Sequence, residues 1–260
     1  MLNPTQRSGN PASRRFRRGV YLLPSLLTLG NLFCGYACIV YTMRGEYETA
    51  APFIGIAFIL DGLDGRIARL TGSEGAFGRE FDSLADMISF GVAPAILAYS
   101  WGLTSFGRWG WAAGFVFVTA AAMRLARFNI QAGSVDKRYF AGMPSPAAAS
   151  VVAATIFAYP AGLRETSGAA PVMALVLVPA FLMVSTIRFR SFKSIDLQAP
   201  RPYTVVLVLG SVIAAIWAHP TGALVILAYS YLASAFVELA INRLRHRTSE
   251  VPAPTPAEQE

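Results

Sequence analysis

The feature that most constrains this chain is a series of apolar runs, each long enough to cross a lipid bilayer as a helix, which takes about 20 residues. The chain is 54% hydrophobic and 14% charged, whereas soluble domains carry about 25% charged residues. We therefore predict an all-α integral membrane protein with about eight transmembrane helices. The predicted helices cover residues 20–43, 49–69, 81–102, 109–130, 144–162, 169–188, 203–218 and 221–241.

The two ends of the chain differ from this pattern. Residues 1–19 are basic and residues 244–260 are rich in proline and polar residues, so we expect both to be disordered arms in the cytoplasm. Residues 20–243 then form one polytopic membrane domain. The first apolar run is too long for a cleaved signal peptide and contains Asn31, so we expect a retained first span.

The distribution of basic residues predicts the orientation. With eight spans, all of the 22 Lys and Arg residues except Arg44, Arg108 and Arg164 fall on the side of the two termini. The positive-inside rule places that side in the cytoplasm. We expect a multi-pass membrane protein with both termini in the cytoplasm. The basic residues are divided among short segments, which argues against a nucleic-acid partner.

Four aspartates interrupt this apolar sequence, in the stretch FILDGLDGRIARLTGSEGAFGREFDSLADMISFGVAPA. Asp61 and Asp64 are three residues apart, and Asp82 and Asp86 are four apart, so each pair lies on one face of a helix. A glycine-rich turn separates the pairs, which predicts a helical hairpin that gathers all four carboxylates. Unpaired, such acids are costly to bury. Carboxylates without Cys or His neighbours favour Mg²⁺ or Mn²⁺, and four suffice for two ions.

The residues around the acids suit a phosphate-containing ligand. Gly65 and Ala68 line the acidic face with small side chains, and Arg69 follows with a planar guanidinium that can grip a phosphate. Gly78 precedes Asp82 by one turn. Taken singly, the glycines are also explained by helix packing, Arg69 by snorkelling to the interface, and the acids by a proton or ion path.

The complete spacing is D-x2-D-G-x2-A-R-x8-G-x3-D-x3-D, and it resembles the defining motif of the CDP-alcohol phosphotransferase family. The resemblance implies a six-helix membrane core, here with two extra helices, usually in a homodimer. It implies an enzyme that transfers a phosphatidyl group from CDP-diacylglycerol to an alcohol and releases CMP.

Carried over by position, the family pattern makes all four aspartates metal ligands and Asp86 also the general base. Gly65, Ala68, Arg69 and Gly78 would shape the CDP pocket, and we expect Thr28 and Asn31 of the first span to contribute to it. Ser25 stands after Pro24 where the family pattern has Asn.

The flanking segments LLTLGNLFCGY, FDSLADMISFGVAPA, RLARFNIQ and YFAGMPSPAAA resemble bacterial members of this family whose acceptor is L-serine. The acceptor or the lipid phosphate would be held by four residues, Arg124, Arg127, Asn129 and Ser89. The two arginines are also explained as ordinary membrane anchors, and Ser89 by packing.

Three other interpretations remain open at this point. A sibling transferase would use another acceptor, such as glycerol 3-phosphate, inositol phosphate or choline. An ion-coupled transporter would use the acids for flux without bond cleavage. A catalytically inactive lipid-binding scaffold would keep the fold alone.

Overall fold

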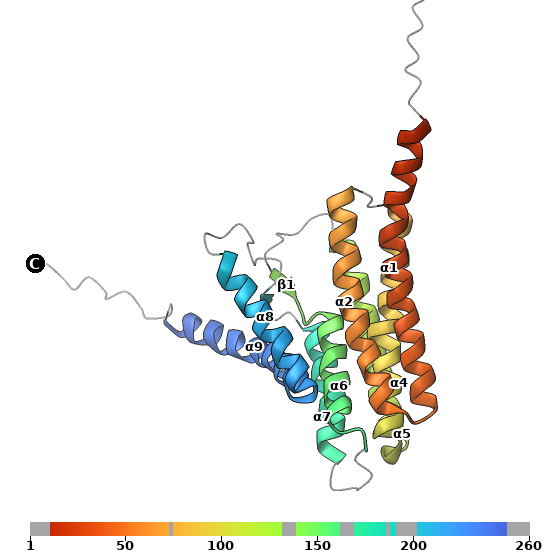
Figure 1. Cartoon of the computed structure of the whole chain (residues 1–260). Coiled ribbons are helices and arrows are strands. Elements are labelled where there is room, and N and C mark those ends of the chain that lie inside the picture. Colours follow the sequence, from red (N-terminus) through yellow and green to blue (C-terminus); the bar gives the residue numbers. More distant parts are fainter. Residues whose placement is uncertain are drawn as a thin grey trace, which may run out of the picture.

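The computed structural model describes residues 11–72, 75–131, 139–161, 169–185, 188–190 and 202–248. In this part of the chain the fold is almost wholly helical (Figure 1). The helices are α1 (Pro11–Met43), α2 (Tyr47–Thr71), α3 (Ala76–Asp86), α4 (Ala93–Trp101), α5 (Arg108–Gln131), α6 (Ser145–Ala158), α7 (Ala169–Val184), α8 (Pro202–Ala218) and α9 (Pro220–Thr248). A π-helix, η1 (Met87–Val92), joins α3 to α4, and a 3₁₀ turn, η2 (Leu103–Phe106), follows α4.

Each predicted apolar run falls on one helix, since α3, η1 and α4 are continuous. Helix α1 begins at Pro11, well before residue 20, and α9 extends to Thr248. Part of each expected arm is therefore helical, while residues 1–10 and 249–260 lie outside the described residues. Among the described residues, three helical stretches are long and apolar enough to cross a membrane: Leu23–Met43, Ala76–Trp101 and Arg108–Ile130.

A short β-ribbon was not predicted. Strand β1 (Tyr139–Ala141) pairs antiparallel with β2 (Arg188–Arg190), which adds a short ribbon to a fold that we expected to be all-α. The two strands lie in connections that follow α5 and α7, so an apolar periodicity could not reveal their pairing.

Two glycines allow the turns of the N-terminal hairpin. Gly45 has a φ of 75° in the α1–α2 connection, where the Glu46 N–H donates to the Tyr41 carbonyl. Gly72 ends α2 with a φ of 61° and donates to the Ala68 and Arg69 carbonyls. Both angles are in the left-handed region, where glycine adds no Cβ penalty. Helix α2 consequently returns along α1 for most of its length.

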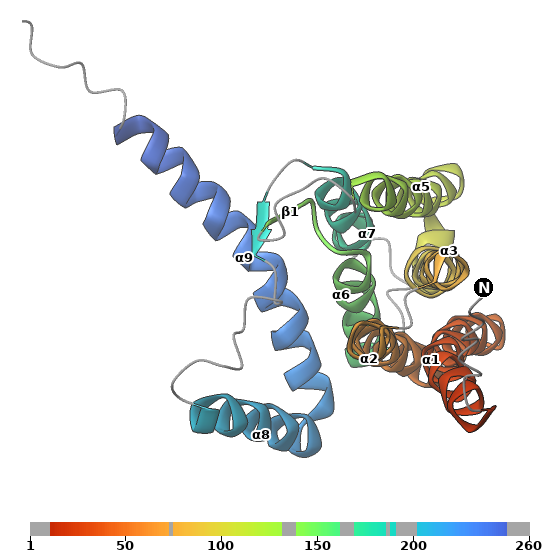
Figure 2. The ribbon, with the colours of Figure 1, turned by 90° about the horizontal axis from the view of Figure 1, so that it is seen from above.

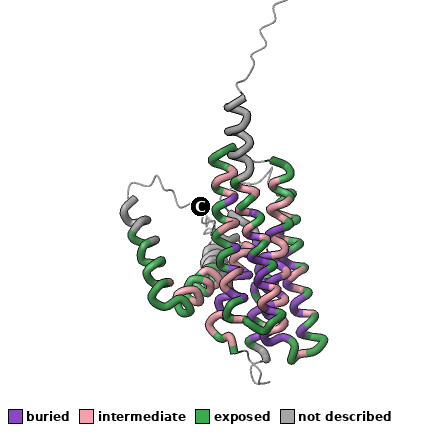
Figure 3. The backbone as a smooth tube through the Cα atoms, turned by 45° about the vertical axis from the view of Figure 1, so that its right-hand side comes forward, coloured by how far each residue is buried: buried purple, intermediate pink, exposed green. Residues whose placement is uncertain are grey.

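The core lies among α1 to α7, seen end-on in Figure 2, and Figure 3 shows that burial is concentrated there. Phe90, Phe117, Ile54 and Leu97 are fully buried in it. Helices α8 and α9 diverge from this bundle, and α9 alone of the two packs closely on α6. The hairpin of α1 and α2, with α3 beside it, positions the acidic residues.

Candidate active site

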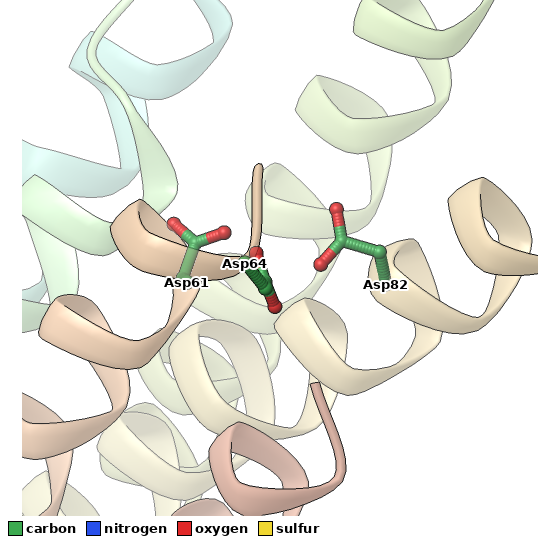
Figure 4. Close-up of side chains that lie close together, drawn as sticks. All are labelled: Asp61, Asp64 and Asp82. Atoms are coloured by element: carbon green, nitrogen blue, oxygen red, sulfur yellow. The ribbon is translucent and has the colours of Figure 1, made fainter. Parts of the chain in front are cut away.

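Helices α2 and α3 bring three of the predicted acids into one cluster. Asp61 and Asp64 project from α2 toward Asp82 of α3 (Figure 4), and ligand oxygens of the three carboxylates lie within 4.8 Å of one another. Asp64 is buried, and Asp61 and Asp82 are half-buried. The prediction that the turn would gather acids from both helices is therefore confirmed for these three.

Asp86 lies one turn beyond Asp82 and interacts electrostatically with Asp61, Asp82 and Asp64. Its Oδ1 accepts a hydrogen bond of 3.0 Å from Nδ2 of Asn31. Asp86 thus belongs to the same charged region, but it faces α1 as well as the other acids.

Helix α1 supplies neutral hydrogen-bond donors to this region. Thr28 Oγ1 lies 3.0 Å from Oδ2 of Asp64, and Asn31 bonds Asp86 as described. Both residues are buried and are three apart, so they occupy one face of α1. The structure thus places both beside the acids, and their expected contact with CDP stays a prediction.

The arrangement fits a hard divalent cation. Three carboxylates converge, and Oδ1 of Asp82 is buried without a hydrogen-bond partner among the described residues. Buried polar atoms are normally paired, and an unpaired oxygen in a cluster of carboxylates is most simply satisfied by a cation. All ligand atoms are oxygens, the donors that Mg²⁺ and Mn²⁺ prefer.

Beside the acids, the small residues leave open space. A Cβ placed on Gly65 would lie 3.5 Å from Nη1 of Arg69, so the guanidinium folds back over this glycine. A Cβ on Gly78 would meet nothing within 4 Å. Arg69 is exposed and Ala68 is half-buried. The predicted phosphate-binding group is therefore contiguous with the acids and accessible.

The candidate acceptor residues are not brought together as one group. Arg124 of α5 interacts electrostatically with Asp86 and Asp61, and its Nη1 donates to Oγ of Ser145 at the start of α6, 2.9 Å away. Asn129 is exposed and donates to Oγ of Ser83. Arg127 is half-buried on the same helix. Arg124 is the member of this group that faces the acids.

Ser89, in η1, packs against α1. It is fully buried, and its Oγ donates to the backbone carbonyl of Asn31 at 2.8 Å. A Cβ on Gly35 would come within 2.5 Å of this oxygen, so α1 and η1 pack with their backbones in close approach. This contact agrees with the packing interpretation of Ser89, and its contact with the acceptor or the lipid phosphate stays a prediction.

The π-helix follows Asp86 directly. The Ala93 N–H bonds the Ile88 carbonyl, five residues back, and Pro94 stands in the first turn of α4. Proline has no N–H to donate to the carbonyl four residues earlier, which favours a locally widened helix just before it. Such π segments occur frequently at functional sites.

Sequence reasoning missed three contacts of the site. These are the bonds from Thr28 to Asp64, from Asn31 to Asp86 and from Arg124 to Ser145. Each joins residues far apart in the chain. The buried polar residues at helical spacing in the first span were the available indication, since such groups require partners.

Comparison with known proteins places the chain in a family. Residues 21–184 match the CDP-alcohol phosphatidyltransferase family model, and the chain belongs to that family. It is 41% identical over 177 residues to a CDP-diacylglycerol--serine O-phosphatidyltransferase of Helicobacter pylori, covering 68% of this chain and 75% of that protein.

Two further relatives come from distant organisms. A Bacillus subtilis protein of the same name is 34% identical over 173 residues, covering 66% of this chain and 91% of that protein. An archaetidylserine synthase of Methanothermobacter thermautotrophicus is 37% identical over 169 residues, covering 64% and 69% of the two chains. The matched family segment contains all four aspartates.

Proposed function

We propose that this chain transfers the phosphatidyl group of CDP-diacylglycerol to the hydroxyl of L-serine, giving phosphatidylserine and CMP. The observation that carries the proposal is the cluster of Asp61, Asp64 and Asp82, with Asp86 one turn away, in a chain of this family. The names of three relatives in bacteria and an archaeon each specify serine or a serine lipid, which supports serine as the acceptor.

The reaction is a substitution at phosphorus. The serine hydroxyl oxygen attacks the phosphorus on the lipid side of the pyrophosphate, and the bond from that phosphorus to the CMP oxygen breaks. Asp86 accepts the hydroxyl proton as the new P–O bond forms. A carboxylate is a weak base for an alcohol, so the proton moves during the attack and not before it.

Asp61, Asp64, Asp82 and Asp86 would hold one or two divalent ions, Mg²⁺ or Mn²⁺. When bound, such ions neutralise the charge that develops on the phosphates. The Thr28 hydroxyl, bonded to Oδ2 of Asp64, keeps that carboxylate in its orientation.

The nucleotide would lie against the small residues of α2 and α3. Gly65 and Ala68 let the pyrophosphate approach α2, and Gly78 leaves space at α3. The Arg69 guanidinium, folded over Gly65, is placed to donate two parallel hydrogen bonds to a phosphate.

Arg124 is the best-placed partner for the serine carboxylate. Arg124 interacts electrostatically with Asp86 and Asp61. A serine carboxylate paired with Arg124 would therefore hold the serine hydroxyl near Asp86. Its bond to Ser145 Oγ uses one of its five N–H donors and fixes the side chain. Arg127 and Asn129 would contact the lipid phosphate or the membrane surface.

The lipid part of the donor has an apolar surface beside the site. A groove of about 890 Å³ between α1 and η1 is lined by Leu26, Leu29, Gly30, Leu32, Phe33, Tyr36, Ile39, Ile88 and Val92. Two of the lining residues, Gly30 and Ile88, stand one residue before Asn31 and two residues after Asp86 in the sequence. An acyl chain of the donor can lie there while its headgroup reaches the carboxylates.

This function fits a multi-pass enzyme of the bacterial cytoplasmic membrane with its active site toward the cytoplasm, where CDP-diacylglycerol and the membrane lipids meet water-soluble serine. We further propose a homodimer, which the family resemblance implies.

The deciding experiment offers purified enzyme CDP-diacylglycerol with L-serine, glycerol 3-phosphate, inositol phosphate or choline in competition, and measures CMP release and the lipid formed. We expect phosphatidylserine to dominate. Chelation with EDTA should abolish turnover, and Mg²⁺ or Mn²⁺ should restore it. Preference for another alcohol would overturn the serine assignment, and undiminished turnover without metal would overturn the metal role.

A further inference from the structure

Residue 31 is bonded twice to the segment that contains Asp86. Its side-chain Nδ2 donates to Asp86 Oδ1 at 3.0 Å, and its backbone carbonyl accepts from Ser89 Oγ at 2.8 Å. The two bonds reach the last residue of α3 and the third residue of η1. They fix the position of that segment relative to α1 at two points three residues apart.

The close packing of α1 on η1 depends on Gly35. A Cβ there would lie 2.9 Å from Cα of Ser89 as well as against its Oγ. These distances are shorter than side-chain contacts in proteins allow, so any larger residue would push the helices apart. Gly35 therefore permits the Ser89 bond, and through it the approach of Asn31 to Asp86.

Asn31 is not explained by stability alone. An ionised carboxylate only accepts hydrogen bonds, so Nδ2 faces Asp86 and Oδ1 is turned away. That Oδ1 is fully buried and has no hydrogen-bond partner among the described residues. A buried unpaired acceptor costs free energy, and an apolar side chain of similar size would avoid the cost. The benefit must come from what the amide does to Asp86.

We propose that Asn31 is a positioning residue for Asp86: its amide, held in place by the Ser89–Gly35 contact, turns one carboxylate oxygen toward α1 and leaves the other directed at the substrate. The proposal rests on the proposed function, in which Asp86 accepts the proton of the alcohol. It assigns to Asn31 a role that needs no contact with the nucleotide.

The test is a double-mutant cycle on CMP release, measured in steady-state reactions with the acceptor that the competition assay selects. Asn31→Ala should lower kcat about 10- to 100-fold, the range typical of residues that orient a metal ligand, while KM for CDP-diacylglycerol stays within about twofold. In an Asp86→Asn background the same substitution should cause almost no further loss, because the group that it orients is already disabled.

Two more variants separate positioning from folding. Ser89→Ala removes only the backbone bond, so we expect a smaller loss than for Asn31→Ala and again none in the Asp86→Asn background. Thr42→Val is the matched control, because Thr42 is buried on the same helix and its hydroxyl donates to the Cys38 carbonyl; its kcat should match the wild type. CMP binding in the presence of Mn²⁺, followed by calorimetry, should be retained in all of these variants.

An equal loss from Asn31→Ala in the wild-type and Asp86→Asn backgrounds would overturn the proposal, as would a loss carried by KM or by CMP binding alone. Wild-type enzyme that releases no CMP with any alcohol would instead refute the proposed function, before the variants are compared.

Discussion

Helices α1 to α7 and the pair α8–α9 are both rich in apolar residues, yet they bury their large apolar side chains to different extents. In the first region large side chains such as Phe90 and Phe117 are fully buried, whereas in α8 Trp217 is 90% exposed. The family match ends at residue 184, the last residue of α7, and every acid of the site lies before it. The proposed catalytic acids therefore all lie in the first region, and α8 presents its apolar surface outward.

The boundary between the regions runs through α9. Ala228, Tyr231 and Leu232 pack against the core, and Tyr231 interacts electrostatically with Arg124. The difference between the regions therefore predicts a graded series of effects, which falls with distance from the acids.

The largest effect is expected at Asp86. Asp86→Asn removes the base while keeping the shape, so turnover should fall about 10²- to 10⁴-fold, the usual contribution of general-base catalysis. The measurement is CMP release at saturating substrates. Glu80→Gln is the control, since Glu80 is an exposed carboxylate on the same helix and its loss should leave turnover unchanged. Equal losses of turnover in the two variants would show that Asp86 acts no differently from an exposed carboxylate of α3.

The next effect is expected at Arg124. Arg124→Lys keeps the charge but loses the planar fork and the bond to Ser145, so KM for serine should rise about 10- to 100-fold, the equivalent of one hydrogen bond to a charged group. Initial rates over a range of serine concentrations measure it. The same change at Arg79, which is exposed on α3, should have no effect. An unchanged KM in Arg124→Lys would show that serine binds elsewhere.

Tyr231 tests whether α9 contributes to the site. Tyr231→Phe removes the hydroxyl near Arg124, and we expect KM for serine to rise about 2- to 10-fold, as for the loss of one neutral hydrogen bond. Tyr229→Phe is the matched variant on the same helix, because its hydroxyl lies 2.9 Å from Thr155 Oγ1 on α6; KM should stay constant there. If both variants behave alike, α9 serves packing only.

The smallest effect is expected in α8. Trp217→Ala truncates an exposed side chain, so stability should change by less than about 0.5 kcal/mol, and CMP release should be unaffected. Thermal unfolding in detergent and the activity assay measure these quantities. A large loss of either would show that α8 is an essential contact surface, contrary to its exposure.

The sequence was sufficient to predict the helices and the acid cluster, for different physical reasons. The helices follow from apolar runs of bilayer length, and the cluster follows from carboxylates at helical spacing on both sides of a glycine-rich turn. Both are local patterns. The D-x2-D and D-x3-D pairs come together once the turn between their two helices forms.

What the sequence did not predict depends on contacts between distant segments. The bond from Ser89 to the Asn31 carbonyl joins η1 to a helix far away in the chain, so the local sequence around Asp86 did not reveal it. The β1–β2 pairing and the partners of Thr28 and Asn31 likewise join elements whose relative position no local pattern fixes.

The π-helix limits how the continuous helix formed by α3, η1 and α4 can change in length. An α-helix advances about 100° per residue, so the one extra residue of a π segment shifts the phase of everything after it by roughly that angle. The acidic face of α3 and the packing face of α4 are therefore set in different registers along one continuous rod. Removing a single residue from Met87–Val92 would bring them into one register, and either the acids or the core contacts would then point the wrong way.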